Sequence, residues 1–201
     1  MRPRSSRLLA SCCALALACA VATTSLGDLR LHAWRFVAIA GGWCVLACVA
    51  AWHSRKFSAV PMAVLATAVL LRLLLLASPP TLSDDLFRYL WEGHIQWAGF
   101  NPFLYPPEHA NLLPLRDSIY EQVTHRGVPT IYPPLAQWLF AGVSLFHSPL
   151  VWKGLAAAAD LGIVWVLARN GRVWAAVLWG LHPLPAVESA AAPPAACASS
   201  C

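Results

Sequence analysis

The sequence has little charge, and the charge it has is unevenly distributed. Charged residues make up 11% of the 201 residues and hydrophobic residues 59%, whereas about a quarter of the residues in soluble domains are charged. This composition excludes an ordinary water-soluble domain and predicts an integral membrane protein. The net charge of +5 does not indicate a nucleic-acid partner, because the basic residues flank apolar runs and form no dense patch.

Patterns typical of metal centres and of repeat proteins are also missing. None of the seven cysteines lies in the polar part of the chain, and none has His or Cys partners at zinc spacing. In apolar helices a cysteine is usually only a small hydrophobic residue. We therefore predict no metal site and no cofactor. The absence of an internal repeat also counts against a transporter built from inverted repeats.

Apolar runs, in contrast, are abundant. A helix needs about 20 apolar residues to cross a hydrocarbon core of roughly 30 Å. The first three of six candidate runs are convincing, the fourth is short, and the sixth is interrupted by Pro183 and Pro185. The runs are Leu8–Leu26, Ala33–Trp52, Phe57–Ser78, Pro134–His147, Pro149–Ala168 and Val173–Val187. The expected fold is an all-α, polytopic membrane protein with about six transmembrane helices.

Cation placement predicts the orientation of these helices. Three arginines at the N-terminus and the basic link at residues 53–56 are expected on the cytoplasmic side. The polar loop after the third helix is then extracytoplasmic. Simple alternation beyond this loop would place Arg169 and Arg172 outside, against the same rule. The predicted regions are three transmembrane helices (1–78), the polar loop (79–133), further transmembrane helices (134–188) and an atypical tail (189–201).

Both ends of the chain leave alternatives open. The run Leu8–Leu26 fits a cleaved signal peptide, but its length and the helices that follow favour an uncleaved signal-anchor. The tail from Ser189 to Cys201 is biased towards small residues and has no clear helix pattern. It reads either as a genuine short tail or, as we prefer, as a truncated or frame-shifted end.

The polar loop concentrates the acidic residues. Six of the nine Asp and Glu residues of the chain lie in it: Asp84, Asp85, Glu92, Glu108, Asp117 and Glu121. Ser83 fits the N-cap of a helix from Asp84 to Ala98, and Gly99 fits the residue after its end. A second short helix is expected around Leu115–Val123.

The first of these helices is expected to be amphipathic. Asp84, Arg88, Glu92 and Gln96 recur every four residues and form one polar stripe. Such a helix suits a membrane surface. Arg88 and Glu92 fit an exposed i, i+4 ion pair, and the functional alternative is that Arg88 holds a lipid phosphate.

Several polar side chains are candidates for chemistry. Asp84 and Asp85 could accept a proton or bind a divalent cation, although acidic residues also cap helix N-termini with no further role. His94 and His125 are weaker acid–base candidates. Asp160 lies within an apolar helix, where a carboxylate either serves a function or hydrogen-bonds to a neighbouring helix. Arg72, near the outer end of its helix, is expected to snorkel to the interface.

Three blocks of the loop resemble a known family. Residues 83–94, 98–103 and 128–137, with the intervening gaps and the flanking membrane helices, look like the first extracytoplasmic loop of bacterial GT-C glycosyltransferases. They are closest to the polyprenol-phosphate-dependent mannosyltransferases. The resemblance covers about residues 60–188 and disappears after Glu188. GT-C enzymes usually have nine or more membrane helices, whereas this chain has about six.

The resemblance implies an inverting transfer of a hexose, mannose in the nearest branch. The donor would be a polyprenyl-phosphate sugar and the acceptor a hydroxyl of a glycan or glycolipid. Transfer would take place at the extracytoplasmic face of the bacterial plasma membrane. Asp84 or Asp85 would be the catalytic base. Substrate contacts would come from Arg88, Glu92, His94, Asn101 and Tyr132. The competing hypotheses are a transporter or flippase of lipid-linked sugars, which Asp160 would suit, and an inactive membrane fragment.

Overall fold

The computed structural model describes residues 3–29, 31–78 and 85–190. They form helices joined by turns and loops, and no strand occurs among them. They divide into two compact units. The first unit contains residues 3–78 and 153–190, and the second contains residues 85–152. The all-helical prediction is confirmed for this part of the chain.

Three helices are long and apolar enough to cross a membrane. They are α1 (Pro3–Ser25), α2 (Ala33–Ser54) and α6 (Pro149–Arg169). At 1.5 Å per residue, the 21 residues of α6 span about 32 Å, close to the thickness of the hydrocarbon core. These helices support the prediction of a membrane protein.

The other predicted runs form shorter helices, and prolines explain most of the difference. Pro61 is the N-cap of α3 (Met62–Leu76), so that residues 57–61 lie outside the helix and 15 residues remain in it. The run Pro134–His147 contains only the 11 residues of α5 (Pro134–Ser144). The run Val173–Val187 is divided into α7 (Val173–Leu181) and α8 (Pro183–Ala190). Six full-length spans are therefore not found among the described residues.

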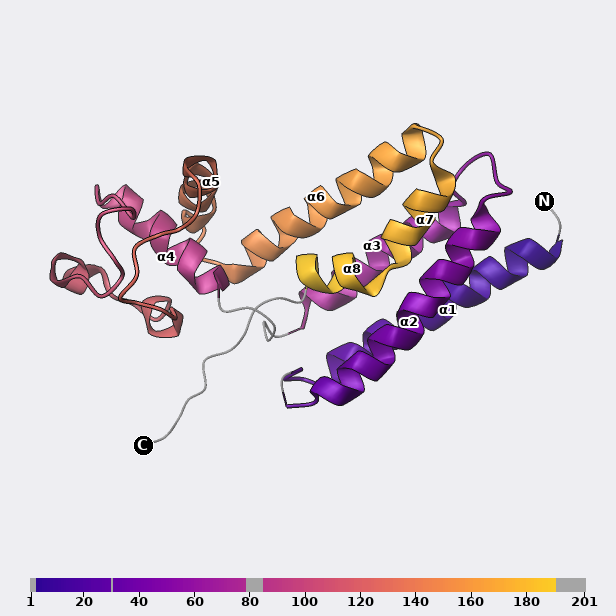
Figure 1. Cartoon of the computed structure of the whole chain (residues 1–201), viewed down its shortest axis with the longest axis horizontal. Helices are drawn as coiled ribbons and strands as arrows, with labels where there is room; N and C mark the ends of the chain where they lie inside the picture. The colour runs from indigo at the N-terminus through magenta and orange to yellow at the C-terminus, as the bar shows by residue number, and fades with distance from the viewer. Residues whose placement is uncertain (1–2, 30, 79–84, 191–201) are drawn as a thin grey trace. The chain divides into compact units, whose positions relative to one another are not determined.

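Within the first unit, α3 and α6 run in opposite directions. The ammonium group of Lys153, near the start of α6, donates hydrogen bonds to the carbonyl oxygens of Leu76 and Ser78 at the far end of α3, at 2.8 and 2.9 Å. At the other end of this unit, the guanidinium of Arg55 lies 5.6 Å from the ring of Trp174, the second residue of α7. The α2–α3 and α6–α7 turns therefore lie at the same end of the unit (Figure 1).

The break between α7 and α8 leaves carbonyl groups without helical partners. The carbonyls of Trp179 and Leu181 would normally accept from the N–H groups four residues later, but those positions are Pro183 and Pro185, which have none. The N–H of Leu184 bonds instead to the side chain of the preceding His182, at 3.2 Å. Carbonyls of this kind need other donors in an apolar environment.

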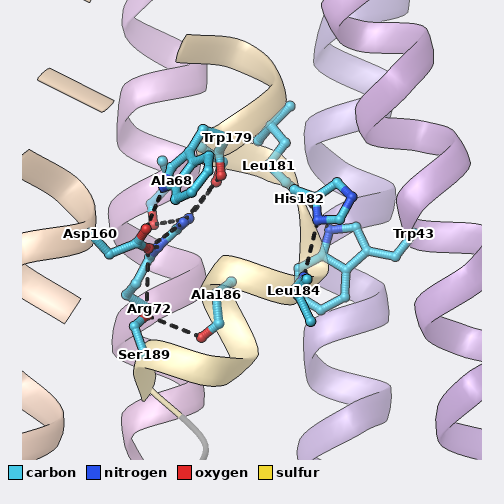
Figure 2. A network of polar contacts seen from close by, with 11 residues as sticks. Trp43, Ala68, Arg72, Asp160, Trp179, Leu181, His182, Leu184, Ala186 and Ser189 are labelled. Carbon is cyan, nitrogen blue, oxygen red and sulfur yellow. Dashed lines mark hydrogen bonds and ion pairs between the residues drawn. The ribbon is translucent and has the colours of Figure 1, made fainter. Parts of the chain in front are cut away.

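Arg72 and Trp43 supply these donors (Figure 2). The guanidinium of Arg72 donates to the carbonyls of Trp179 and Gly180, and the indole of Trp43 donates to the carbonyl of Leu181 at 2.7 Å. Both side chains are almost fully buried, Arg72 with 1% of its surface exposed and Trp43 with none. The prediction that Arg72 snorkels to the interface is therefore wrong, because the broken helix holds it inside the unit.

Asp160 balances the charge of Arg72 (Figure 2). Its carboxylate accepts two hydrogen bonds from the guanidinium, at 2.8 and 2.7 Å, and one from the indole of Trp179 at 2.5 Å. The hydroxyl of Ser189 lies at 3.4 Å. Of the two alternatives considered for Asp160, the structure therefore shows the second, in which the carboxylate hydrogen-bonds to neighbouring helices.

The second unit is built around α4 (Asp85–Trp97), which packs against α5 and against the 3₁₀ turn η2 (Tyr120–Gln122). The helix predicted from Asp84 to Ala98 is confirmed from Asp85 to Trp97, whereas Ser83 and Asp84 lie outside the described residues. Gly99 has a φ of +85°. Its N–H and that of Phe100 bond back to Gln96 and Ile95, which is the Schellman arrangement that ends a helix.

The prediction that α4 lies on a surface is wrong. Eight of its 13 residues are buried, including Arg88 and Glu92 from the predicted polar stripe. Helical periodicity identifies which residues share a face, but it does not reveal what covers that face. Within the helix predicted around Leu115–Val123 only the 3₁₀ turn η2 is found, and another 3₁₀ turn, η1 (Ala110–Leu115), comes before it.

Candidate active site

A cavity of about 170 Å³ opens beside the first turn of α4. Asp85, the first residue of the helix, contributes an exposed carboxylate to it. Tyr132 comes from the segment that leads into α5. The remaining wall is formed by Arg88, Thr124, His125, Val128, Pro129 and Ile131. Two of the three blocks on which the family resemblance rests therefore meet at one cavity.

Two tyrosine hydroxyl groups lie within hydrogen-bonding reach of Asp85. Burial raises the pKa of Tyr132, and the neighbouring Tyr89 hydroxyl and the Asp85 carboxylate raise it further. Burial also raises the pKa of Tyr89, where the hydrogen bond from Tyr132 acts in the opposite direction and Asp85 adds to the increase. Both phenols stay protonated at neutral pH and can donate hydrogen bonds to an anion or to a sugar oxygen.

Aromatic rings hold these tyrosines in place. The ring of Tyr89 stacks on Phe140 with centroids 4.4 Å apart and meets the edge of Tyr132 at 5.1 Å. Trp152 lies 5.0 Å from Tyr89 and 5.5 Å from Phe140. Such ring pairs add packing energy beyond the area they bury. The cluster fixes the hydroxyl groups beside Asp85.

Arg88 fixes the opposite wall of the cavity. Its guanidinium bonds to Glu92 at 2.5 Å and donates to the backbone carbonyls of His125 at 3.0 Å and Val128 at 2.5 Å. His125 has a φ of +53°, an unusual conformation for a residue with a side chain. With these three partners, Arg88 acts as a clamp on the 125–128 turn rather than as a free phosphate ligand.

Glu92 is the centre of a buried network behind the cavity. One carboxylate oxygen accepts from Arg88, and the other accepts from the Thr130 hydroxyl at 2.7 Å and the Gln137 amide at 2.6 Å. Gln96 extends the network to the Gln137 side-chain oxygen at 2.9 Å. Glu92 is only 1% exposed. The predicted i, i+4 ion pair exists, but it is buried rather than exposed to water.

Gly93 allows α4 and α5 to approach this closely. A Cβ atom at Gly93 would lie 2.2 Å from the carbonyl oxygen of Phe140 and 2.7 Å from the Cβ of Ser144. Side-chain atoms do not tolerate such distances to backbone, so any larger residue must push the helices apart. Phe140, which Tyr89 stacks on, would move with α5.

The other predicted site residues lie elsewhere. His94 faces His147, with ring nitrogens 3.4 Å apart, and does not line the cavity. Asn101 caps a turn by accepting from the N–H of Phe103 at 3.0 Å. Asp84 lies outside the described residues. The structure therefore brings Asp85, Arg88 and Tyr132 together at the cavity, with Glu92 behind them.

Sequence reasoning missed Tyr89, Thr130 and Gln137. Tyr89 follows Arg88 directly and lies one turn after Asp85, so helical spacing alone could have marked it as a neighbour of the carboxylate. Thr130 and Gln137 lie 38 and 45 residues from Glu92, and no local pattern connects residues so far apart. Comparison of the chain with protein-family models, with curated proteins and with solved structures gives no match.

Proposed function

We propose that the chain is a GT-C-type glycosyltransferase. In this proposal it moves a hexose, mannose in the nearest branch of the resemblance, from a polyprenyl-phosphate donor to a hydroxyl of a glycan or glycolipid. The reaction takes place at the extracytoplasmic face of a bacterial plasma membrane. The observation that carries the proposal is the exposed carboxylate of Asp85 in a cavity that Tyr132 also lines, with Tyr89 beside these two residues.

The arrangement of the three resembling blocks supports this proposal. Asp85 and Tyr132, from the first and third blocks, line the same cavity. Glu92 and Thr130, again from the first and third blocks, share a buried hydrogen bond. The middle block joins through the carbonyl of Pro102, which accepts from the N–H of Thr130 at 3.1 Å. Segments that resemble one family in sequence thus also pack against one another.

The proposed reaction is a single displacement. Asp85 takes the proton of the acceptor hydroxyl while the oxygen of that hydroxyl bonds to the anomeric carbon. The bond from the anomeric carbon to the phosphate oxygen breaks, and polyprenyl phosphate leaves with the electron pair. Attack from the opposite face inverts the anomeric centre. Tyr89 and Tyr132 can donate hydrogen bonds to sugar oxygens, and Asp84 is the alternative base.

We also infer a topology for the catalytic segment. Lys153 binds the carbonyls of Leu76 and Ser78, so the segment between them leaves and re-enters the first unit at one end. It therefore crosses the membrane an even number of times. The 11-residue α5 spans only about 16 Å, too short for one crossing. Neither α4 nor α5 crosses, and Arg169 and Arg172 return to the same side as Arg55, in accord with the charge rule.

The exposed face of α5 suits contact with the membrane surface. Leu135 and Trp138 are each 74% exposed, and Ile131 just before the helix is 82% exposed. Apolar and Trp side chains of this kind partition into the lipid interface. This contact would hold the cavity near the depth at which a lipid-linked donor presents its sugar. The contact with the membrane surface that was predicted for α4 is thus assigned to α5.

A transfer assay tests the proposal. The full chain is expressed in membranes that lack the equivalent endogenous activity, and a mannosyl-phosphoryl-polyprenol with radiolabelled mannose is added. Transfer is measured as label recovered in extracted glycolipid and glycan. Loss of a general base typically lowers the rate by about 10²- to 10⁴-fold. We expect a loss of this size for Asp85→Asn, with Asp84→Asn as the parallel variant.

The matched control is Glu121→Gln. Glu121 belongs to the same unit, is exposed, and loses the same charge in this substitution. It should transfer at the wild-type rate. The proposal fails if the wild-type chain transfers no label, or if both aspartate variants transfer as fast as Glu121→Gln. Movement of labelled lipid across the membrane without transfer would instead support a flippase. That alternative relied on Asp160, whose carboxylate is already held by Arg72 and Trp179.

A further inference from the structure

A large cavity of the first unit lies at its basic end. It measures about 870 Å³ and is lined by Ser5 and by residues 56–62, which form the turn between α2 and α3. Its lining combines the ammonium group of Lys56 and two serines with the apolar side chains of Phe57, Val60 and Met62. The cavity thus has both a cationic and an apolar part.

Lys56 is available to a ligand. Its side chain is exposed, and it makes no hydrogen bond or ion pair with the described residues. The other described cations of this end are Arg7, Arg55, Arg169 and Arg172. Of the carboxylates in the described part of the first unit, Asp28 lies in the connection between α1 and α2, Glu188 lies in α8, and Asp160 is paired with Arg72. The positive charge of this end is therefore not balanced by nearby acidic residues.

The arginines at this end lie against tryptophan rings. The guanidinium of Arg55 is 4.4 Å from the ring of Trp52 and 5.6 Å from that of Trp174, and Arg169 is 4.9 Å from Trp165. Tryptophan is enriched at the level of lipid headgroups, and arginines beside it face the phosphates. The level of these rings places the mouth of the cavity among the headgroups.

We propose that this cavity binds the headgroup of an anionic phospholipid. Lys56 pairs with the lipid phosphate, and the apolar wall formed by Phe57, Val60 and Met62 contacts the glycerol and the first methylene groups. A basic pocket between membrane helices is a recognised kind of acidic-lipid site. The occupant is a lipid because a free anion would leave the apolar wall uncovered. This proposal is independent of the glycosyltransferase proposal and concerns the opposite end of α3.

Lipid binding to the purified full chain tests the proposal. The chain in a non-ionic detergent is titrated with dioleoylphosphatidylglycerol or dioleoylphosphatidylcholine, and bound lipid is counted by native mass spectrometry. Phosphatidylglycerol should bind more tightly, and added salt should weaken its binding. Loss of one Lys near an anionic surface lowers affinity about fivefold. We expect this loss for Lys56→Gln and recovery for Lys56→Arg.

Arg35→Gln provides the matched control. Arg35 lies at the other end of α2, also beside a tryptophan ring, at 5.3 Å from Trp34. Arg35→Gln removes one positive charge, as Lys56→Gln does, and should leave phosphatidylglycerol binding unchanged. The proposal is overturned if the two lipids bind equally, if Arg35→Gln and Lys56→Gln lose the same affinity, or if inorganic phosphate at equal concentration displaces the lipid.

Discussion

The two units each contain a buried arginine–carboxylate pair, and the two pairs do different work. Arg72 and Asp160 lie 88 residues apart and join helices of the first unit. Arg88 and Glu92 lie four residues apart on one helix of the second unit. In both pairs the arginine also binds backbone carbonyls. The carbonyls in the first unit come from a broken helix, and those in the second come from the turn that walls a cavity.

This difference shows how the same side-chain chemistry can serve structure in one place and a site in another. In the first unit the carboxylate of Asp160 is itself buried and is held by hydrogen bonds from other helices, so it is not available to react. In the second unit the Arg88–Glu92 pair is also buried, but Arg88 holds the 125–128 turn, which forms a wall of the cavity that Asp85 and Tyr132 line. The carboxylate proposed to react is therefore Asp85, which lies outside the Arg88–Glu92 pair.

The largest expected effect is the loss of stability when the Arg72–Asp160 pair is broken. Asp160→Ala leaves Arg72 charged and uncompensated in an apolar interior, which typically costs about 3–5 kcal/mol. Unfolding by SDS titration, followed by circular dichroism in detergent, measures the loss. Glu188→Ala, which removes an exposed carboxylate from α8 of the same unit, is the comparison. A stability of Asp160→Ala equal to that of wild type would show that Arg72 does not depend on this partner.

Breaking the Arg88–Glu92 pair should lower the stability less. Glu92→Gln keeps the shape of the side chain but removes the charge-assisted bond to Arg88, and hydrogen bonds to charged groups contribute about 1.5–3 kcal/mol. The same SDS titration should show this loss. Glu121→Gln, an exposed position in the same unit, should stay within about 0.5 kcal/mol of wild type. A loss of equal size in the two variants would mean that the buried network contributes nothing.

Two glycines sharpen the comparison between the units. Gly93→Ala pushes a Cβ atom into the backbone of α5, and overpacking of this kind costs about 1–3 kcal/mol. At Gly180 the new Cβ would meet the Cβ of Ala68 at 3.3 Å and the methyl groups of Val164 at 3.7 and 3.8 Å, all side-chain atoms. A gain in helix propensity of about 1 kcal/mol offsets this milder crowding. Gly93→Ala should therefore be destabilised in the SDS titration and Gly180→Ala should not. The reverse order would contradict the helix contacts described.

The smallest expected effect concerns pH. All four tyrosines lie in the second unit, and folding raises the pKa of Tyr89 and Tyr132. A raised pKa favours the protonated form in the folded state, so the contribution is complete below pH about 10 and is lost as the pH rises above it.

At pH 11 the loss contributed by Tyr132 should be about 1 kcal/mol, and Tyr132→Phe should remove it. Tyrosinate absorbance and SDS titrations between pH 9 and 11 provide the measurement. Tyr105→Phe is the control, because Tyr105 lies apart from Asp85. An identical pH slope in wild type and Tyr132→Phe would show that Tyr132 ionises as freely in the folded chain as in the unfolded one.

The sequence predicts local features of this fold well and remote ones poorly. The helix from Asp85 and its end at Gly99 follow from neighbouring residues. The burial of Glu92 depends on Thr130 and Gln137, which no spacing rule connects to it. The position of Arg72 was predictable in principle. Pro183 and Pro185 remove two N–H groups from an apolar segment, and counting the carbonyls left without partners would have required a buried donor.

The candidate site follows the same division. Asp85 and Tyr132 were marked by the resemblance, because each lies within a short recognisable block. Tyr89 was missed although helical spacing placed it beside Asp85. The sequence does not reveal that Arg88 is occupied, because its partners are backbone carbonyls at residues 125 and 128, which every residue type provides.

One measurement tests the central distinction between a reactive and a structural carboxylate. Transfer from radiolabelled mannosyl-phosphoryl-polyprenol is compared for Asp85→Asn and Asp160→Asn, per folded molecule and alongside the stability of each variant. We predict that Asp85→Asn loses transfer by at least about 10²-fold per folded molecule, whereas Asp160→Asn is less stable than Asp85→Asn and its folded fraction transfers normally. Transfer that survives in Asp85→Asn and disappears from folded Asp160→Asn would contradict this account.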